Sequence, residues 1–199
     1  RTVISGFYHQ GKPPRIEDLK SVYSGVTELI ADFAAQDMLT LYESGEIKGC
    51  YPFTTEPGPH RIHINGHDVY AMCALDALAP GAMFACVSRV NSNCAVSGES
   101  ILIELNDRDI VNARDVADVY FGINWNAAKS GSSCADSLCT EMLFLKNAQI
   151  AQCWLQEDNQ DREIFGLADA IAFAAEFFMP LMAQGGPDCD SPNATLRII

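Results

Sequence analysis

The sequence predicts an α+β fold, with helices near both ends of the chain and a meandering sheet between them. The N-terminal part shows two short helical patterns followed by two strand patterns. The middle contains apolar runs separated by turn residues, which is typical of consecutive strands, and an Ala- and Phe-rich segment near the C-terminus predicts a buried helix. With 199 residues, of which 48% are hydrophobic, the chain can bury a substantial core.

The N-terminal part has the outline of a winged helix. Residues 16–23 form a short amphipathic pattern, and a second helical pattern runs over residues 29–42. Residues 47–53 and 61–64 then predict two strands joined by a Pro- and Gly-containing loop. Any small helical subdomain followed by a hairpin would give the same pattern, so we interpret this part as structural support.

The central and C-terminal parts alternate between strand and helix patterns. Asn65-Gly66 predicts a turn, and the Ala-rich residues 67–78 predict a helix that Pro80-Gly81 ends, with Cys73 in its middle. The remaining predicted elements are strands at residues 83–90, 100–105, 119–123 and 138–145, and helices at residues 150–155 and 164–182.

Charge and cysteine content exclude several classes of protein. The 13 basic and 26 acidic residues give a net charge of −13, which argues against a nucleic-acid partner. No run approaches the roughly 18 apolar residues of a membrane span, so we expect a soluble protein without a membrane partner. Eight cysteines without a CxxC pair are too sparse for a disulfide scaffold. No signal peptide is visible, and we expect a cytoplasmic location with mostly reduced thiols.

Cys73, Asp76 and Cys139 offer two thiols and a carboxyl suited to one reaction. In a helix, Cys73 and Asp76 would project from the same face. A carboxyl among apolar neighbours is costly to bury, and burial would raise its pKa and keep a proton available. Thiolates that bind a soft metal, beside an acid that delivers a proton to a departing carbon, are equipped for proton-assisted cleavage of a carbon–metal bond.

The other cysteines and the histidines have simpler interpretations. Free cysteines often act as small buried hydrophobes, and we interpret Cys50, Cys86 and Cys153 in this way. Cys134 and Cys139 have a spacing that would suit half of a zinc site, but no second pair completes it. The histidines that cluster in sequence, His60, His63 and His67, are predicted to be surface or loop residues.

Three stretches carry a resemblance to a known family. Residues 59–78 contain a Pro-His-Arg approach, a Gly-His turn and a Cys-Ala-Leu-Asp core. Residues 88–98 contain Arg-Val-Asn-Ser-Asn-Cys-Ala-Val-Ser-Gly, and Ser137-Leu-Cys139 completes the set. In order and approximate spacing these stretches are similar to those of the organomercurial lyase (alkylmercury lyase) family of bacterial mercury resistance, which the chain resembles over roughly residues 10 to 180.

The resemblance implies an activity and a set of roles. The activity is cleavage of a small organomercurial, R–Hg⁺, to the hydrocarbon RH and Hg(II). Cys73 and Cys139 would bind mercury, Asp76 would help to transfer the proton, and Cys94 matches a cysteine regarded as structural. No added cofactor is implied, because mercury enters as substrate and leaves as product to cellular thiols or a mercuric reductase, and external thiols are needed for turnover.

The resemblance also implies the organisation of the chain. Residues 1–64 would form a winged-helix-like N-terminal subdomain that does not bind DNA, packed on a core of antiparallel strands surrounded by helices. Residues 65–183 would form this catalytic α+β core. The residues themselves predict a flexible tail over 184–199. The chain departs from the family at Thr140, where many members have a second cysteine, and at Ala79-Pro80-Gly81, where Phe-Pro is common. These departures concern the pocket more than the three reactive residues.

Two other functions use the same residues. A carrier or sensor without enzymatic activity would hold Hg(II) or Cu(I) between Cys73 and Cys139, but it would have no need of Asp76. A lyase for another organometallic substrate would use all three. A third hypothesis is a degenerate family member that recruits a partner protein, and the presence of all three reactive residues argues against it.

Overall fold

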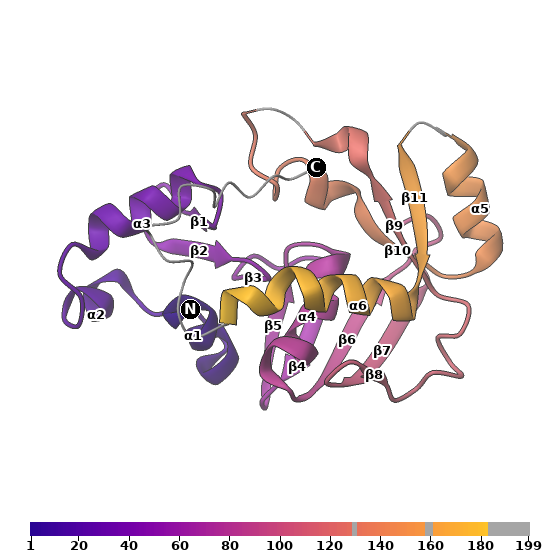
Figure 1. Ribbon diagram of the computed structural model, residues 1–199, viewed down its shortest axis with the longest axis horizontal. Coiled ribbons are helices and arrows are strands. Elements are labelled where there is room, and N and C mark those ends of the chain that lie inside the picture. Colours follow the sequence, from indigo (N-terminus) through magenta and orange to yellow (C-terminus); the bar gives the residue numbers. More distant parts are fainter. Residues whose placement is uncertain (129–130, 158–160, 183–199) are drawn as a thin grey trace.

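The computed structural model describes residues 1–128, 131–157 and 161–182 (Figure 1). The helices are α1 (Thr2–Gln10), α2 (Ile16–Lys20), α3 (Val26–Ala35), α4 (Ala74–Phe84), α5 (Ala148–Glu157) and α6 (Leu167–Phe178), with short 3₁₀ helices η1 (Trp125–Ala127), η2 (Leu138–Glu141) and η3 (Met179–Met182). The strands are β1 (Leu39–Leu41), β2 (Ile47–Cys50), β3 (Phe53–Thr54), β4 (Arg61–Ile64), β5 (His67–Ala71), β6 (Val87–Asn93), β7 (Ser100–Asn106), β8 (Asp109–Ile110), β9 (Tyr120–Asn124), β10 (Met142–Leu145) and β11 (Arg162–Gly166).

The strands form two antiparallel sheets. The larger sheet has the order β1-β2-β3-β5-β4-β6-β7-β8, and the smaller one has the order β10-β9-β11. The predicted α+β class, with antiparallel strands and surrounding helices, is confirmed. In the described part of the chain, no helix has both the length and the apolar character needed to cross a bilayer.

One face of the larger sheet forms the main core. In β7, Ile101, Ile103 and Leu105 point inward and are buried, while Leu102 on the opposite face is exposed. Strands β4 and β6 show the same alternation. This pattern is expected of an antiparallel sheet with one face on the core and one in water.

Helix α4 packs against this face of the larger sheet and belongs to the main core. Every residue from Ala74 to Met83 is buried. The helix packs against α6, β10 and the strands of the larger sheet, and Figure 1 shows α6 crossing it. At Gly81, a Cβ atom would lie 2.5 Å from the carbonyl oxygen of Asp107, so this approach requires glycine. Because these residues of α4 are buried, the N-terminal end of the helix lies inside the protein.

Helices α2 and α3 enclose a small core of their own, whereas the buried residues of α1 belong to the main core. Leu19, Val26 and Ile30 pack with Leu39 of β1 and Ile47 of β2. Because β1 and β2 also belong to the larger sheet, the same strands join this small core to the main one. The winged-helix likeness and the boundary after residue 64, the last residue of β4, stay predictions. The predicted tail at 184–199 lies outside the described residues.

The prediction of a helix over residues 67–78 was wrong at its start and at its end. Residues His67–Ala71 form β5, because Asn65 (φ 49°) and Gly66 (φ 80°) make the tight turn of a β4–β5 hairpin. Helix α4 begins only after Cys73 and continues through Pro80. The free energy gained by burying this helix is larger than the cost of the backbone hydrogen bond that Pro80 cannot donate.

Further predicted boundaries were wrong. The strand predicted over residues 83–90 is β6 (Val87–Asn93), because α4 continues to Phe84. Leu39–Leu41 form a strand instead of the end of a helix, and Arg162–Gly166 form strand β11 before α6 begins. Residues Leu138–Glu141 form a 3₁₀ turn ahead of β10. In each case, the local structure is set by pairing with a neighbouring strand or by the geometry of a connection between two elements. A short apolar pattern in the sequence does not show either of these. Helix α1 was not predicted.

Candidate functional site

Cys73 lies at the entrance to α4. The residue follows β5 in extended conformation (φ −148°, ψ −178°) and is the N-cap of the helix. Its Sγ accepts a hydrogen bond from the backbone N–H of Asp76 at 3.4 Å, as the side chain of an N-cap residue does. Unpaired N–H groups and the helix dipole at this end stabilise negative charge, so the position favours a metal-bound thiolate.

Asp76 lies in the first turn of α4 and is 1% exposed. Its Oδ1 atom has no hydrogen-bond partner among the residues that the structure describes. Burial raises the pKa of this carboxyl to about 7, and hydrogen bonds with Cys73 only partly oppose the shift. The carboxyl therefore keeps a proton in a substantial fraction of molecules near neutral pH, which the sequence pattern predicts.

Cys139 reaches the same point from η2, in the connection before β10. It is 5% exposed, and its Sγ lies 4.0 Å from Oδ2 of Asp76. The ligand atoms of Cys73, Asp76 and Cys139 all lie within 4.8 Å of one another. The structure thus brings together the three residues that the sequence identifies as candidates, and one soft metal ion between them would contact both thiols and the carboxyl.

Their surroundings raise the pKa of both candidate thiols and so favour the neutral form of each. Burial raises the pKa of Cys73 to about 11, although a hydrogen bond with Cys139 lowers it. The pKa of Cys139 is lowered by its hydrogen bond with Cys134, but its bond with Cys73 and its burial together raise it above the ordinary range. A soft metal ion that binds these thiols as thiolates must therefore displace their protons.

Two further sulfur atoms border the site. Cys134 Sγ lies 3.4 Å from Cys139 Sγ, and the thiol of Cys73 donates to the thioether sulfur of Met142 at 3.6 Å. The cysteines remain free thiols, and no second pair completes the zinc site considered for Cys134 and Cys139 among the described residues. Met142 has no sequence signal, because it is one apolar residue in a strand.

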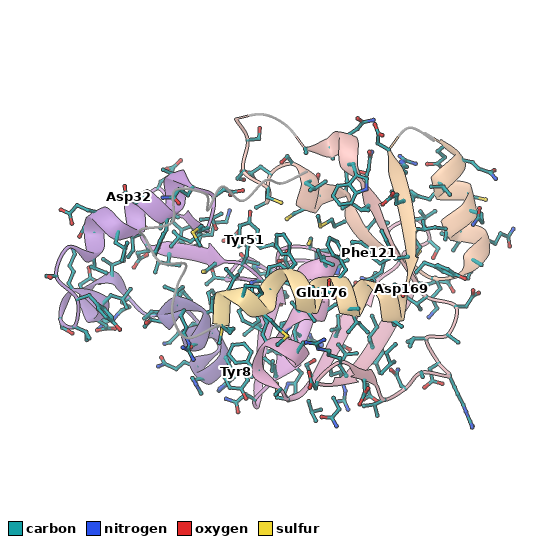
Figure 2. All side chains as sticks on the ribbon, in the orientation of Figure 1. Tyr8, Asp32, Tyr51, Phe121, Asp169 and Glu176 are labelled. Carbon is teal, nitrogen blue, oxygen red and sulfur yellow. The ribbon has the colours of Figure 1, made fainter. Side chains whose placement is uncertain are left out.

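The N-terminal part holds the segment that carries Cys134 and Cys139. The carboxylate of Asp37 accepts hydrogen bonds from the backbone N–H of Cys134 at 2.5 Å and from the hydroxyl of Tyr51 at 3.3 Å. The hydroxyl oxygen of Tyr51 accepts a bond from the N–H of Ala135 at 2.8 Å. Figure 2 shows Tyr51 near the centre of the molecule. Sequence reasoning missed both residues, since their partners are backbone groups far along the chain.

The three clustered histidines do not join this site. His60 is buried, with Nδ1 2.8 Å from Ser92 Oγ, and burial lowers its pKa to about 4. The prediction of a surface or loop residue was wrong for His60, because the ring packs edge-on against Phe144. His63 lies at the surface beside Asp68 at 2.9 Å, and Nε2 of His67 hydrogen-bonds the carbonyl oxygen of His9.

Cys94 is buried in the turn after β6. Its Sγ accepts a hydrogen bond from the N–H of Ser97 at 3.5 Å, and its own N–H donates to the carbonyl oxygen of Glu99 at 2.8 Å. These contacts order the turn into β7, which fits a structural cysteine.

Comparisons with known proteins give one consistent result. The family model described as alkylmercury lyase matches residues 53–179, well over half of the chain. An alkylmercury lyase of Staphylococcus epidermidis is 26% identical over 163 residues, covering 81% of this chain and 73% of the relative. One from Streptomyces lividans is 24% identical over 149 residues, covering 74% and 67%. The crystal structure of the mercury-bound form of MerB2 has a similar fold, with a TM-score of 0.69 at 19% identity, covering 84% of this chain and 81% of that one.

Proposed function

The chain belongs to the alkylmercury lyase family, and we propose that it cleaves the carbon–mercury bond of a small organomercurial by protonolysis at Cys73, Asp76 and Cys139. The observation that carries the proposal is the meeting of two buried thiols with a buried carboxyl, all within 4.8 Å. Each group supplies one element of the chemistry.

The thiols bind the metal and weaken the bond to carbon. One thiol exchanges with the ligand that R–Hg⁺ brings, and the proton of this thiol leaves with the ligand. The second thiol passes its proton to the carboxylate of Asp76 and coordinates mercury as a thiolate. Two soft thiolates increase electron density at mercury and on the attached carbon, which prepares the carbon to accept a proton.

Asp76 then completes the reaction. Its carboxyl protonates the carbon, RH departs, and Hg(II) remains bound between Cys73 and Cys139. The overall balance is R–Hg⁺ and two thiols giving RH, the Hg(II) bis-thiolate and one proton. A carboxyl whose pKa is near 7 suits both steps, since it accepts a proton from a thiol and donates it to carbon at neutral pH.

The reaction in this scheme uses no resident cofactor, because the metal arrives with the substrate. Regeneration of the two protein thiols requires an acceptor for Hg(II), either small cellular thiols or a mercuric reductase. Both the free protein thiols and the thiol acceptors fit the reducing cytoplasm.

Substitution of Asp76 by Asn tests the proposal against a metal carrier. Asn keeps the shape of the side chain but cannot donate a proton to carbon. A lyase with this substitution binds methylmercury through its thiols and releases no methane, whereas the wild type releases methane. A carrier releases none in either form, and that result would contradict the proposal.

A further inference from the structure

A third thiol lies at the edge of the candidate site. Cys134 Sγ is 3.4 Å from Cys139 Sγ, and the proposed cleavage reaction does not use it. Cys73 and Cys139 are 2% and 5% exposed, while Cys134 is only partly buried. Of the three thiols, Cys134 is therefore the one that lies closest to solvent.

The backbone holds Cys134 in this position. Its N–H donates to Asp37, and its carbonyl oxygen accepts bonds from the N–H groups of Ser137 and Cys139, the latter at 2.9 Å. The two sulfurs are thus in contact without a disulfide, whose S–S bond would be about 2.05 Å. A metal ion bound to Cys139 therefore comes within reach of Cys134.

Because the Hg(II) product is buried, its release requires a further thiol near the site. After cleavage, Hg(II) is held by two cysteines that external thiols cannot easily approach. Thiolates hold this soft metal tightly, so release requires one thiolate to replace another at the metal. A third thiol beside the buried pair provides the first replacement inside the protein.

We propose that Cys134 is a mercury(II) ligand that takes the product from Cys73 and presents it to external thiols; this inference rests on the proposed function of the site. The Cys134 thiol attacks Hg(II), its proton passes to the departing Cys73 thiolate, and the metal is then shared by Cys139 and Cys134. Two external thiols next replace both protein sulfurs and protonate them. Mercury stays in the +2 state throughout, and no oxidant or reductant takes part.

The first test uses mercuric chloride alone and does not depend on lyase activity. In the Cys73→Ser protein, the metal should still be held by two sulfurs, those of Cys139 and Cys134. Removal of Cys134 as well should weaken Hg(II) binding about tenfold or more in competition with a small thiol, and X-ray absorption should find one protein sulfur fewer. The matched control replaces Cys73 and Cys153, a cysteine exposed on α5, and should bind as the Cys73→Ser protein does.

The second test separates handover from cleavage. The Cys134→Ser protein should still release methane in a first turnover, but transfer Hg(II) to glutathione about tenfold or more slowly than the wild type. Serine keeps a hydroxyl that can hydrogen-bond Cys139, so a merely positioning role would leave the transfer unchanged. Cys134→Ala provides a second variant, and it should show the same slow transfer.

Each result decides one of the two proposals. Equal Hg(II) binding with and without Cys134, or equal transfer rates in the wild type and both Cys134 variants, would overturn the handover role and leave the lyase intact. A wild type that forms no methane, but binds Hg(II) through Cys139 and Cys134, would refute the lyase and leave the thiol relay in place.

Discussion

The thiol of Cys73 caps the helix that carries Asp76, through a 3.4 Å hydrogen bond from the Asp76 N–H to the Cys73 Sγ. This contact fixes the thiol and the carboxyl, the proposed metal ligand and proton donor, relative to each other. It also places the sulfur where helix N–H groups stabilise a thiolate. The start of α4 therefore sets the geometry of this pair. Cys139 comes from η2, a separate connection in the chain.

The Asp76→Asn substitution should abolish turnover while metal binding persists. General acid catalysis contributes about 10² to 10⁴ in rate, and we expect a loss of at least this size. Single-turnover methane release and Hg(II) binding, measured on the same preparation, check the two halves of the prediction. Loss of metal binding together with activity would show that Asp76 supports the site in another way.

The ionisation of Asp76 should make folding stability depend on pH. Its folded pKa, about 7, is above that of an exposed Asp, so the folded state binds more protons between about pH 4 and pH 7. This contribution to stability is present at the acidic end and is lost as the pH rises towards 7. The full effect is on the order of 4 kcal/mol, about 1.4 kcal/mol for each pKa unit.

Urea unfolding of the wild type and the Asp76→Asn protein at pH 4.5 and 7.5 measures this effect. The difference between the two proteins should shift in favour of the variant at the higher pH. His60, whose folded pKa of about 4 acts in the opposite direction, is present in both proteins and cancels in the comparison. A difference that does not change with pH would show that Asp76 titrates normally.

The Asp37→Ala substitution should reduce activity through the segment that carries Cys134 and Cys139. It removes the acceptor for the Cys134 N–H and for the Tyr51 hydroxyl, and displacement of a reacting group by about 1 Å costs up to roughly a hundredfold in rate. Asp37→Asn keeps a carbonyl acceptor and should restore much of the loss. Asp32→Ala, on the exposed face of α3, is the matched control in a methane-release assay. Equal losses at positions 37 and 32 would contradict the role of the anchor.

The Gly81→Ala substitution should destabilise the protein by about 1 to 3 kcal/mol, because the added methyl group overpacks α4 against the turn after β7. Its Cβ would lie 2.5 Å from the Asp107 carbonyl oxygen, whereas a Cβ at Gly58 meets its nearest atom at 4.0 Å. Gly58→Ala is therefore expected to change stability by only about 0.5 kcal/mol. Denaturant unfolding of the two variants compares the sites, and a small effect at both would mean that the turn moves freely.

The fold class follows from the sequence because most strands show clear alternation or turn residues at their ends. Residues 67–78 show why the boundaries of the helices and strands cannot be predicted from the sequence in the same way. Their alanines favour a helix, but the Asn65-Gly66 turn starts a hairpin, and cross-strand pairing with β4 decides the conformation of β5. Helix α4 then continues through Pro80, because burial by α6 and the sheet maintains it.

The sequence motifs identify Cys73, Asp76 and Cys139 as candidate site residues. Their catalytic roles stay predictions. The surroundings of these residues could not be predicted. Cys134 lies beside Cys139 through a loop conformation that has no periodic pattern, and its anchor at Asp37 is a contact between distant segments. Such contacts depend on the assembled fold.

In the proposed reaction, two thiols and one carboxyl cleave the carbon–mercury bond by transfer of an exchangeable proton. Mass spectrometry of the gas released from methylmercury in D₂O, with excess thiol, tests it most directly. We expect multiple turnovers of singly deuterated methane from the wild type, and none from the Cys73→Ser, Cys139→Ser and Asp76→Asn proteins. Wild-type protein that binds methylmercury tightly and releases no methane, or any of the three variants turning over at the wild-type rate, would contradict it.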